Sequence, residues 1–209
     1  DRLLSRGLGD VYKRQPAYYE DLKEIQNKYW TMLDDAVKNR NSPFRIPVFI
    51  CSDQNEIDGR IVVLRKSDRG NNLLQFHTDL RSSKINILNK NKNASLVFYD
   101  KEEKIQLRVK VECIINNKNS ITEESWKKTQ HISRRCYLTD DPPGTISNNP
   151  TSGMISKLED FDYTMEQSEE GYRNFTVIQC KVKSVEWLYL AAKGHRRAKF
   201  DFENKKESW

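Results

Sequence analysis

The residues of this 209-residue chain best suited to chemistry lie close together near position 80. Asp79 is a good N-cap for a helix that starts there, because its carboxylate can accept hydrogen bonds from the free N–H groups of the first turn. Those N–H groups and the positive end of the helix dipole attract anions. Thr78, Ser82 and Ser83 add hydroxyl donors, and Lys84 adds a cation. The pattern predicts a phosphate-binding site, although it is also typical of an ordinary capped helix with solvated polar side chains.

A strand and a hairpin position that junction. The run RIVVLR at 60–65 is rich in β-branched residues and predicts a short central strand with an arginine at each end. Turn residues follow, and the apolar run 73–76 pairs back as the second strand of a hairpin. The helix then covers 80–90. Arg60 and Arg65 are an odd number of residues apart, so a regular strand would point them to opposite faces unless a bulge intervenes.

The other expected elements are helices and strands of ordinary length. Apolar residues recur at helical spacing over 18–37, and the run 105–115 alternates apolar and polar residues as a half-buried strand does. Gln106 falls on the polar face of that strand, where it could reach a ligand or meet solvent. A capping box at 120–123 predicts a helix through Trp126 to about residue 131. Further strands are expected over 44–51 and 94–99, a long strand or a bent pair of strands over 174–190, and a last strand led by 194–200. A further helix is expected over 154–169.

Composition limits the class of protein. No apolar run approaches the roughly 20 residues that a membrane helix needs. The cysteines are far apart in the sequence, which disfavours a zinc site or a disulfide framework and favours the cytoplasm. The net charge of +6 is mild, and no basic stripe with regular aromatic residues points to nucleic acid. We therefore expect a small-molecule ligand, and neither nucleic acid, membrane nor metal.

The first residues differ from the rest of the chain. Residues 1–15 lack apolar periodicity, and we interpret them as a non-native leader. A single domain is then expected over 16–209, a length sufficient for one hydrophobic core.

The order of these motifs resembles the pyridoxamine 5′-phosphate oxidase family of FMN-binding split β-barrels. The matching pieces are RIVVLR at 60–65, His77-Thr78, Ser82-Ser83-Lys84 and Gln106-Leu107-Arg108. The resemblance runs from about residue 46 to the C-terminus and is strongest up to residue 111. It is closest to the less-studied FMN-binding branch. It implies an α+β domain, an antiparallel split β-barrel of Greek-key type with peripheral helices.

The resemblance also implies the cofactor and its contacts. FMN would bind at the interface of a homodimer. Arg65 takes the place of a lysine that serves flavin and substrate, which keeps the charge but changes its geometry. Lys199 is an alternative to Arg197 in the C-terminal cluster. The implied cofactor contacts are Arg60, Ile61, Val62, Val63, Arg65, His77, Thr78, Ser82, Ser83, Lys84, Gln106, Trp187 and Arg197.

A second set of residues is implied for the substrate. In the family a Tyr, an Arg and a Ser at intervals of four hold the substrate phosphate, and here His131, Arg135 and Thr139 stand at those intervals. Arg65 and His195 complete the set. The change of Tyr to His and the DDPPG turn that follows disfavour a pyridoxal-type substrate, and the stretch also suits an ordinary helix C-terminus. No catalytic base is assigned, because the flavin supplies the chemistry.

The expected function is that of an FMN-dependent oxidoreductase of the pyridoxamine 5′-phosphate oxidase type. It would act in the cytoplasm on a small amine-bearing substrate, phosphorylated or not, with oxygen as acceptor. The alternative is a flavin reductase, or an electron-transfer or storage protein, that binds FMN without the oxidase reaction. Barrels that bind haem or a deazaflavin, or that carry no redox group, are further alternatives.

Overall fold

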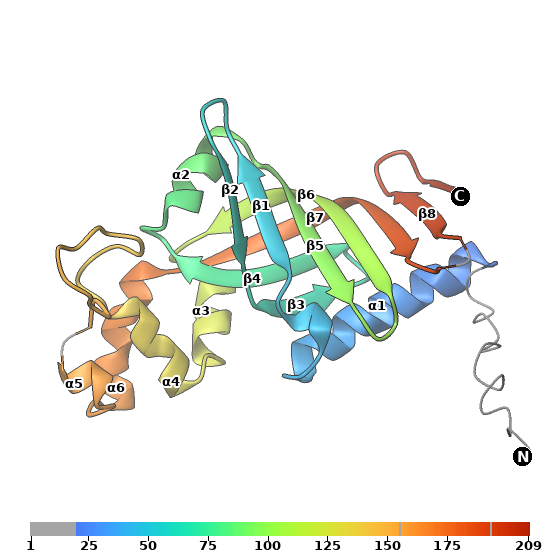
Figure 1. Cartoon of the computed structure of the whole chain (residues 1–209). Coiled ribbons are helices and arrows are strands. Elements are labelled where there is room, and N and C mark those ends of the chain that lie inside the picture. The colour runs from blue at the N-terminus through green and yellow to red at the C-terminus, as the bar shows by residue number, and fades with distance from the viewer. Residues whose placement is uncertain (1–19, 155, 193) are drawn as a thin grey trace, which may run out of the picture.

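The computed structural model describes residues 20–154, 156–192 and 194–209 (Figure 1). The leader expected at 1–15 lies outside these residues. Every helix in the described ranges is too short or too polar to cross a lipid bilayer. The helices are α1 (Leu22–Lys38), η2 (Pro43–Arg45), α2 (Ser83–Lys90), α3 (Ser120–Lys127), α4 (His131–Arg134), η3 (Arg135–Tyr137), α5 (Ser156–Glu159), α6 (Met165–Ser168) and η4 (Glu169–Asn174).

The described strands form one antiparallel sheet. They are β1 (Val48–Ser52), β2 (Ile57–Ile61), β3 (Leu64–Asp68), β4 (Leu73–Asp79), β5 (Asn93–Asp100), β6 (Ile105–Asn116), β7 (Phe175–Tyr189), β8 (Arg196–Asp201) and β9 (Lys206–Ser208). The main path runs β2-β1-β5-β6-β7-β4-β3, and β8 and β9 extend it from β7. The path does not close on itself, which fits the expected α+β split barrel.

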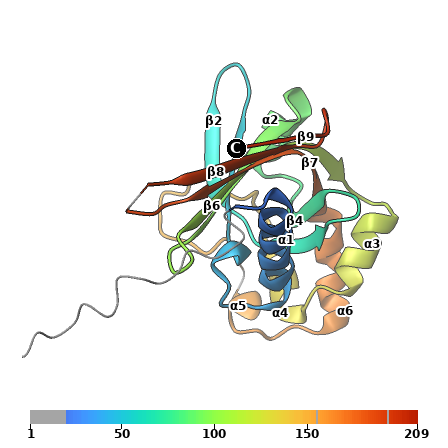
Figure 2. The ribbon, with the colours of Figure 1, turned by 90° about the vertical axis from the view of Figure 1, so that its right-hand side faces the viewer.

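Strand β7 connects the parts of this sheet. It pairs with β6 over nearly its whole length. Its first half also pairs with β4, and its second half pairs with β8. The two halves therefore carry different partners on the side opposite β6, so the sheet splits there. Figure 1 shows β6 and β7 crossing the molecule side by side, and Figure 2 shows α1 near the middle of the view with α3 and α6 to one side.

Helix α1 covers the core on one side of the sheet. Asp21 caps it by accepting hydrogen bonds from Lys23 N at 2.7 Å and Glu24 N at 3.1 Å. Its apolar face packs against β3 and includes Tyr29, whose ring lies 5.4 Å from that of Phe200 on β8. The helix predicted over 18–37 is thus confirmed for the described part.

The strand predicted over 60–65 is wrong. The run RIVVLR belongs to two strands, because the chain leaves β2 after Ile61 and enters β3 at Leu64. Strand β2 pairs only with β1 at one end of the sheet path, whereas β3 pairs with β4 at the other. The hairpin predicted between this run and the next is confirmed for β3 and β4. A register shift at Arg65 adds the bulge that the sequence left open.

Several helix boundaries also differ from the prediction. Helix α2 starts at Ser83 and not near Leu80, because the Asp79 carboxylate accepts from Arg81 instead of capping a helix. The box that opens α3 is formed by Asn119 and Thr122 and not by 120–123, because Asn119 supplies the capping oxygen.

The C-terminal helices are shorter than predicted. The expected helix over 154–169 is replaced by α5 and α6, because Phe161 has a left-handed φ of 59° and Thr164 caps a new helix with Gln167. The first strand starts at Val48, after the short η2 turn, and not at residue 44. The strand predicted over 174–190 is confirmed as β7.

Candidate functional site

Five predicted residues meet at the start of α2. Lys84 Nζ donates to Thr78 Oγ1 and to Ser82 Oγ, each at 2.7 Å. Arg60 reaches across from β2, with Nη1 3.1 Å from Ser82 Oγ and Nη2 3.0 Å from Ser83 Oγ. Strand β2, the end of β4 and α2 thus bring together residues from two separate stretches of sequence. We call this group the α2 cluster.

The electrostatics of the α2 cluster favour an anion. The Lys84 side chain is only 6% exposed, and no carboxylate of the described residues lies within ion-pair distance of it. Burial, and then the nearby Arg60, lower the pKa of Lys84 from 10.5 to about 8. Arg60 is partly balanced by an ion pair with Asp58. An anion between Arg60 and Lys84 would relieve this repulsion, because an opposite charge favours the charged amine.

A phosphate fits these donors well. The Ser82 side chain makes no capping hydrogen bond to α2, so its hydroxyl is available to the cluster. The first turn of α2 adds backbone N–H groups and the positive end of the helix dipole. Charge-assisted bonds from Lys and Arg to phosphate are among the strongest that proteins make. The α2 cluster can therefore hold a phosphate group through side chains and backbone together.

Two other predicted residues lie on the opposite face of the sheet. Gln106 on β6 is in register with Leu188 on β7, and Leu188 is in register with Arg197 on β8. Side chains of directly paired residues share a face, so Gln106 and Arg197 stand in one row two strands apart. Leu107, the neighbour of Gln106, points into the core. The prediction that Gln106 lies on the polar face is confirmed.

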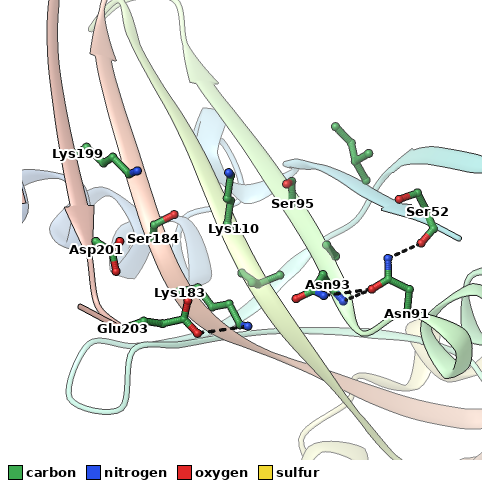
Figure 3. Close-up of a pocket in the computed structure, with 13 residues that line it drawn as sticks. Ser52, Asn91, Asn93, Ser95, Lys110, Lys183, Ser184, Lys199, Asp201 and Glu203 are labelled. Atoms are coloured by element: carbon green, nitrogen blue, oxygen red, sulfur yellow. Dashed lines mark hydrogen bonds and ion pairs between the residues drawn. The ribbon is translucent and has the colours of Figure 1, made fainter. Parts of the chain in front are cut away.

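A polar cavity of about 470 Å³ continues that outer face (Figure 3). Its walls come from β1, β5, β6, β7 and β8, and Figure 3 shows Lys110, Ser184 and Lys199 along them. At its rim the Lys183 ammonium lies 3.3 Å from Glu203. Lys199, the alternative to Arg197, therefore belongs to this hollow and is exposed there.

The other predicted site residues near the C-terminus, Trp187 and His195, lie in different parts of the structure. Trp187 is fully buried in the hydrophobic core, in register with Leu107 and Ala198. It therefore lies on the face opposite the Gln106 row. His195 is exposed in the turn before β8. Within one chain the structure brings neither residue to the α2 cluster.

The predicted pair His77 and Thr78 points to two sides of β4. Thr78 faces the α2 cluster, whereas the His77 ring packs edge-on against Phe175 with centroids 4.8 Å apart. Successive strand residues face opposite ways, which explains the division. His77 and Arg65 instead line a separate, basic cavity. Of the apolar residues between the two arginines, Val62 is buried and Ile61 is exposed.

The predicted substrate residues do not converge on one point. The His131 ring packs on Tyr163 at 4.2 Å, and Arg135 lies over Phe161 and donates to Leu158 O at 3.1 Å. Thr139 Oγ1 accepts from Arg81 Nη2 at 3.1 Å. The prediction that these three residues share one face assumed a continuous α-helix. Helix α4 instead ends at Arg134, and the chain continues as the 3-10 turn η3.

Sequence reasoning missed Arg81, which joins the α2 cluster region to the loop at 139–141. Its guanidinium pairs with Asp79 at 2.8 Å and donates to Thr139 O at 3.0 Å and Asp140 O at 2.8 Å. The only sequence signal was an arginine two residues after a candidate capping aspartate. Arg40 and Arg45, which line the basic cavity, were also missed, because no local pattern links them to 60–84.

Comparison with solved structures defines the class of fold. An FMN-binding protein of Nostoc punctiforme PCC 73102, described as pyridoxamine 5′-phosphate oxidase-related, superposes with a TM-score of 0.66 at 16% identity, over 88% of this chain and 93% of that one. PhzG from Burkholderia lata 383, solved with tetrahydrophenazine-1-carboxylic acid, gives 0.66 at 14% identity over 97% of each chain. The chain has the fold of these proteins, an α+β split barrel.

The sequence comparison matches part of the chain to one family. Residues 26–117 match the family described as pyridoxamine 5′-phosphate oxidase, FMN-binding domain. The matched region holds the whole α2 cluster and Gln106. No curated protein matches the chain. FMN, the cofactor expected from the sequence, is thereby confirmed as the cofactor of the matched domain. The α2 cluster fits its phosphate, because Arg60 and Lys84 converge there without a full complement of carboxylates.

Proposed function

We propose that the protein is an FMN-dependent oxidoreductase of the pyridoxamine 5′-phosphate oxidase type. It would act on a small amine-bearing substrate, phosphorylated or not, with oxygen as acceptor. The observation that carries the proposal is the α2 cluster, a buried lysine and an arginine arranged around Ser82 at a helix start. The match of residues 26–117 to an FMN-binding domain supports it.

The residues of this chain would bind and orient the cofactor. Arg60, Lys84 and the hydroxyls of the α2 cluster would hold the phosphate. When bound, FMN would supply two-electron chemistry, accepting the hydride of a C–H bond at the amine-bearing carbon of the substrate and passing the electrons to oxygen. Gln106 and Arg197 would contact the flavin and substrate side through the row that they share. Both side chains can donate hydrogen bonds without a change of charge.

We also propose that the working form is a homodimer. The α2 cluster and the Gln106 row lie on opposite faces of the sheet in one chain, so a second copy is needed to bring such residues to one cofactor. Apolar side chains are exposed on the same outer face, and one of them, Tyr99, is paired directly with Gln106. Ile57 is 81% exposed, Ile61 59% and Tyr99 49%. An apolar surface of this kind is typical of a protein interface.

A second candidate is an FMN-binding reductase or electron-transfer protein without oxidase activity. The observation that favours it is the use of His131, Arg135 and Thr139 in contacts within the chain. A phosphate of a pyridoxamine-type substrate would have to displace those contacts. The location in the cytoplasm, predicted from the cysteines, stays a proposal.

Turnover separates the two candidates. The protein would be loaded with FMN and incubated with pyridoxamine 5′-phosphate and oxygen, and peroxide formation would be followed. Sustained turnover supports the oxidase. Retained FMN without turnover on this or other amines, but with reduction by a nicotinamide cofactor, supports the reductase. A protein that does not retain FMN contradicts both.

A further inference from the structure

Two buried cysteines face each other across neighbouring strands of the sheet. Cys113 on β6 is in direct register with Cys180 on β7. Their Sγ atoms lie 4.0 Å apart, and one thiol donates a hydrogen bond to the other. Both side chains belong to the hydrophobic core and carry free thiols. The two residues are 67 positions apart in the sequence, so only the pairing of β6 with β7 brings them together.

The backbone at these two positions has the arrangement that a cross-strand disulfide needs. The N–H of Cys113 donates to Lys92 O at 2.8 Å, on the side of β5. The N–H of Val182, two residues after Cys180, donates to Asn72 O on the side of β4. Both cysteines therefore direct their backbone groups away from each other. They form a non-hydrogen-bonded pair, whose Cα atoms lie about 4.5 Å apart in antiparallel sheets.

This spacing permits a bond between the two sulfurs. Disulfides join residues whose Cα atoms are about 4.4–6.8 Å apart. The sulfurs would have to approach to about 2 Å, which a change of side-chain rotamer can bring about while the strands stay paired. The third buried cysteine, Cys51, faces Asp58 on β2 and Ala94 on β5, so no cysteine lies opposite it. The register therefore favours the pair Cys113 and Cys180.

None of the contacts proposed for FMN or the substrate uses these two thiols. A single buried cysteine is an ordinary core residue, because it packs as a small apolar side chain. Two cysteines in register with hydrogen-bonded sulfurs also form a dithiol, which loses two electrons when it becomes a disulfide.

We propose that Cys113 and Cys180 form a redox modification site, which hydrogen peroxide converts to a cross-strand disulfide. The inference goes beyond the proposed function, because it concerns residues that bind neither cofactor nor substrate. It does not depend on oxidase activity, since added peroxide serves as the oxidant.

The reaction needs no other reactant. The thiolate of one cysteine attacks peroxide, so that an S–O bond forms, the O–O bond breaks and hydroxide leaves. The second thiol then attacks the sulfenic sulfur and gives up its proton, so that the S–S bond forms and water leaves. In total the two thiols lose two electrons and two protons, and peroxide is reduced to two waters.

The surroundings of the pair should make this reaction slow. The hydrogen bond to Cys113, and then burial, raise the pKa of Cys180, so its thiolate is rare at neutral pH. Peroxide also reaches the pair only when the strands open transiently. Cys136 is exposed and should react first, which makes it an internal measure of the peroxide dose.

The disulfide would join the two ends of a long segment. Helices α3 to η4 all lie in the chain between β6 and β7. Closing a loop of this length restricts the unfolded chain more than the folded one. The oxidised protein should therefore unfold at a higher urea concentration than the reduced protein.

Peptide mass spectrometry tests the inference. Reduced protein, with and without FMN, would be treated with hydrogen peroxide at the dose that fully oxidises Cys136. Remaining thiols would then be blocked with N-ethylmaleimide under denaturing conditions. We expect a peptide linked through Cys113 and Cys180 within one chain, in most molecules, and its loss after reduction with dithiothreitol.

Two variants and a second measurement accompany this test. Cys113→Ala should form no link and should lose the shift in urea unfolding that peroxide gives the parent. The matched control is Cys51→Ala, at a buried cysteine with no cysteine opposite it, which should form the link as the parent does. If Cys113→Ala does not fold, the peptide map of the parent decides the question alone.

Three outcomes would overturn the inference. They are recovery of Cys113 and Cys180 as free thiols while Cys136 is fully oxidised, a link through Cys51 or Cys136 in place of this pair, and a link that forms only between chains. The test also separates this inference from the proposed function. A protein that retains no FMN but forms the link contradicts the proposed function and supports the modification site.

Discussion

Lys84 is the residue on which the cofactor site depends most. It is a buried cation that donates only to hydroxyls, and burial lowers its pKa to about 8. Its neighbour along the helix, Lys90, is exposed and pairs with Asp53 at 2.7 Å. The two lysines share residue type and helix but differ in surroundings, so they form a matched pair for mutation.

Lys84→Met should weaken FMN binding by about ten- to hundredfold, because a charged hydrogen bond contributes about 1.5–3 kcal/mol. Methionine keeps the apolar stem and removes a poorly balanced charge, so the fold should be kept. Lys90→Met is the control and should bind FMN as the parent does. Fluorescence titration with FMN measures both. Equal affinities for the two variants would contradict the phosphate site.

The affinity for FMN should fall as the pH rises above about 8. The free protein loses the charge of Lys84 there, because its pKa is lowered to about 8. A bound phosphate favours the charged amine, so binding at higher pH must take up a proton. The dissociation constant should then rise by up to about tenfold per pH unit. Titrations between about pH 7 and pH 9.5 measure this slope.

Lys84→Arg is the control for the pH dependence, since arginine stays charged over the whole range. Its FMN affinity should be nearly independent of pH. The same slope in Lys84→Arg and the parent would show that another group titrates.

At the scale of elements, local sequence patterns predicted the helices and strands better than they predicted how these elements pair in the fold. The alternation over 105–115 and the helical spacing before residue 38 gave β6 and α1 nearly in full, because burial on one face dictates both patterns. RIVVLR failed because its β-branched residues suit any strand, and only pairing with β1 and β4 divides it. The α2 cluster was largely predicted, since three of its residues follow one another.

Other parts of the site could not be predicted from local sequence. The assignment of His131, Arg135 and Thr139 to one face assumed an α-helix, which η3 interrupts. The role of Asp79 was also misjudged, because a cap for α2 and a partner for Arg81 look alike in sequence. Only the position of the loop at 139–141 decides between them.

Arg81→Met tests the contact between β4 and that loop. The Asp79 carboxylate, 5% exposed, would lose its charged partner, and Thr139 and Asp140 would lose donors. We expect the free energy of unfolding to fall by about 1–3 kcal/mol, as measured by urea denaturation. Arg173→Met, at an exposed arginine, should change it little. An unchanged stability of Arg81→Met would mean that the loop is held by other contacts.

At the scale of the whole molecule, the predicted cofactor residues lie on both faces of the sheet. One face carries the α2 cluster, and the other carries the Gln106 row beside exposed isoleucines. A homodimer would bring the two kinds of residue together across an interface. The fold alone does not fix the assembly, since function resides in the site.

Ile57→Asp and Ile61→Asp should convert the proposed dimer to monomer, because a buried carboxylate without a partner is costly at an apolar interface. Sedimentation velocity measures the mass. The matched control is Ile146→Asp, at an isoleucine that is 95% exposed on the loop after η3, and it should leave the dimer intact. A parent that is monomeric, or Ile57 and Ile61 variants that stay dimeric, would argue against this interface.

The central claim is that this chain binds FMN through the α2 cluster. The most direct test is an absorption spectrum of the purified protein after incubation with FMN and removal of the excess by gel filtration. The account predicts flavin absorption that elutes with the protein at one FMN per chain and is lost in Lys84→Met. Protein that elutes without flavin after incubation with micromolar FMN would contradict it.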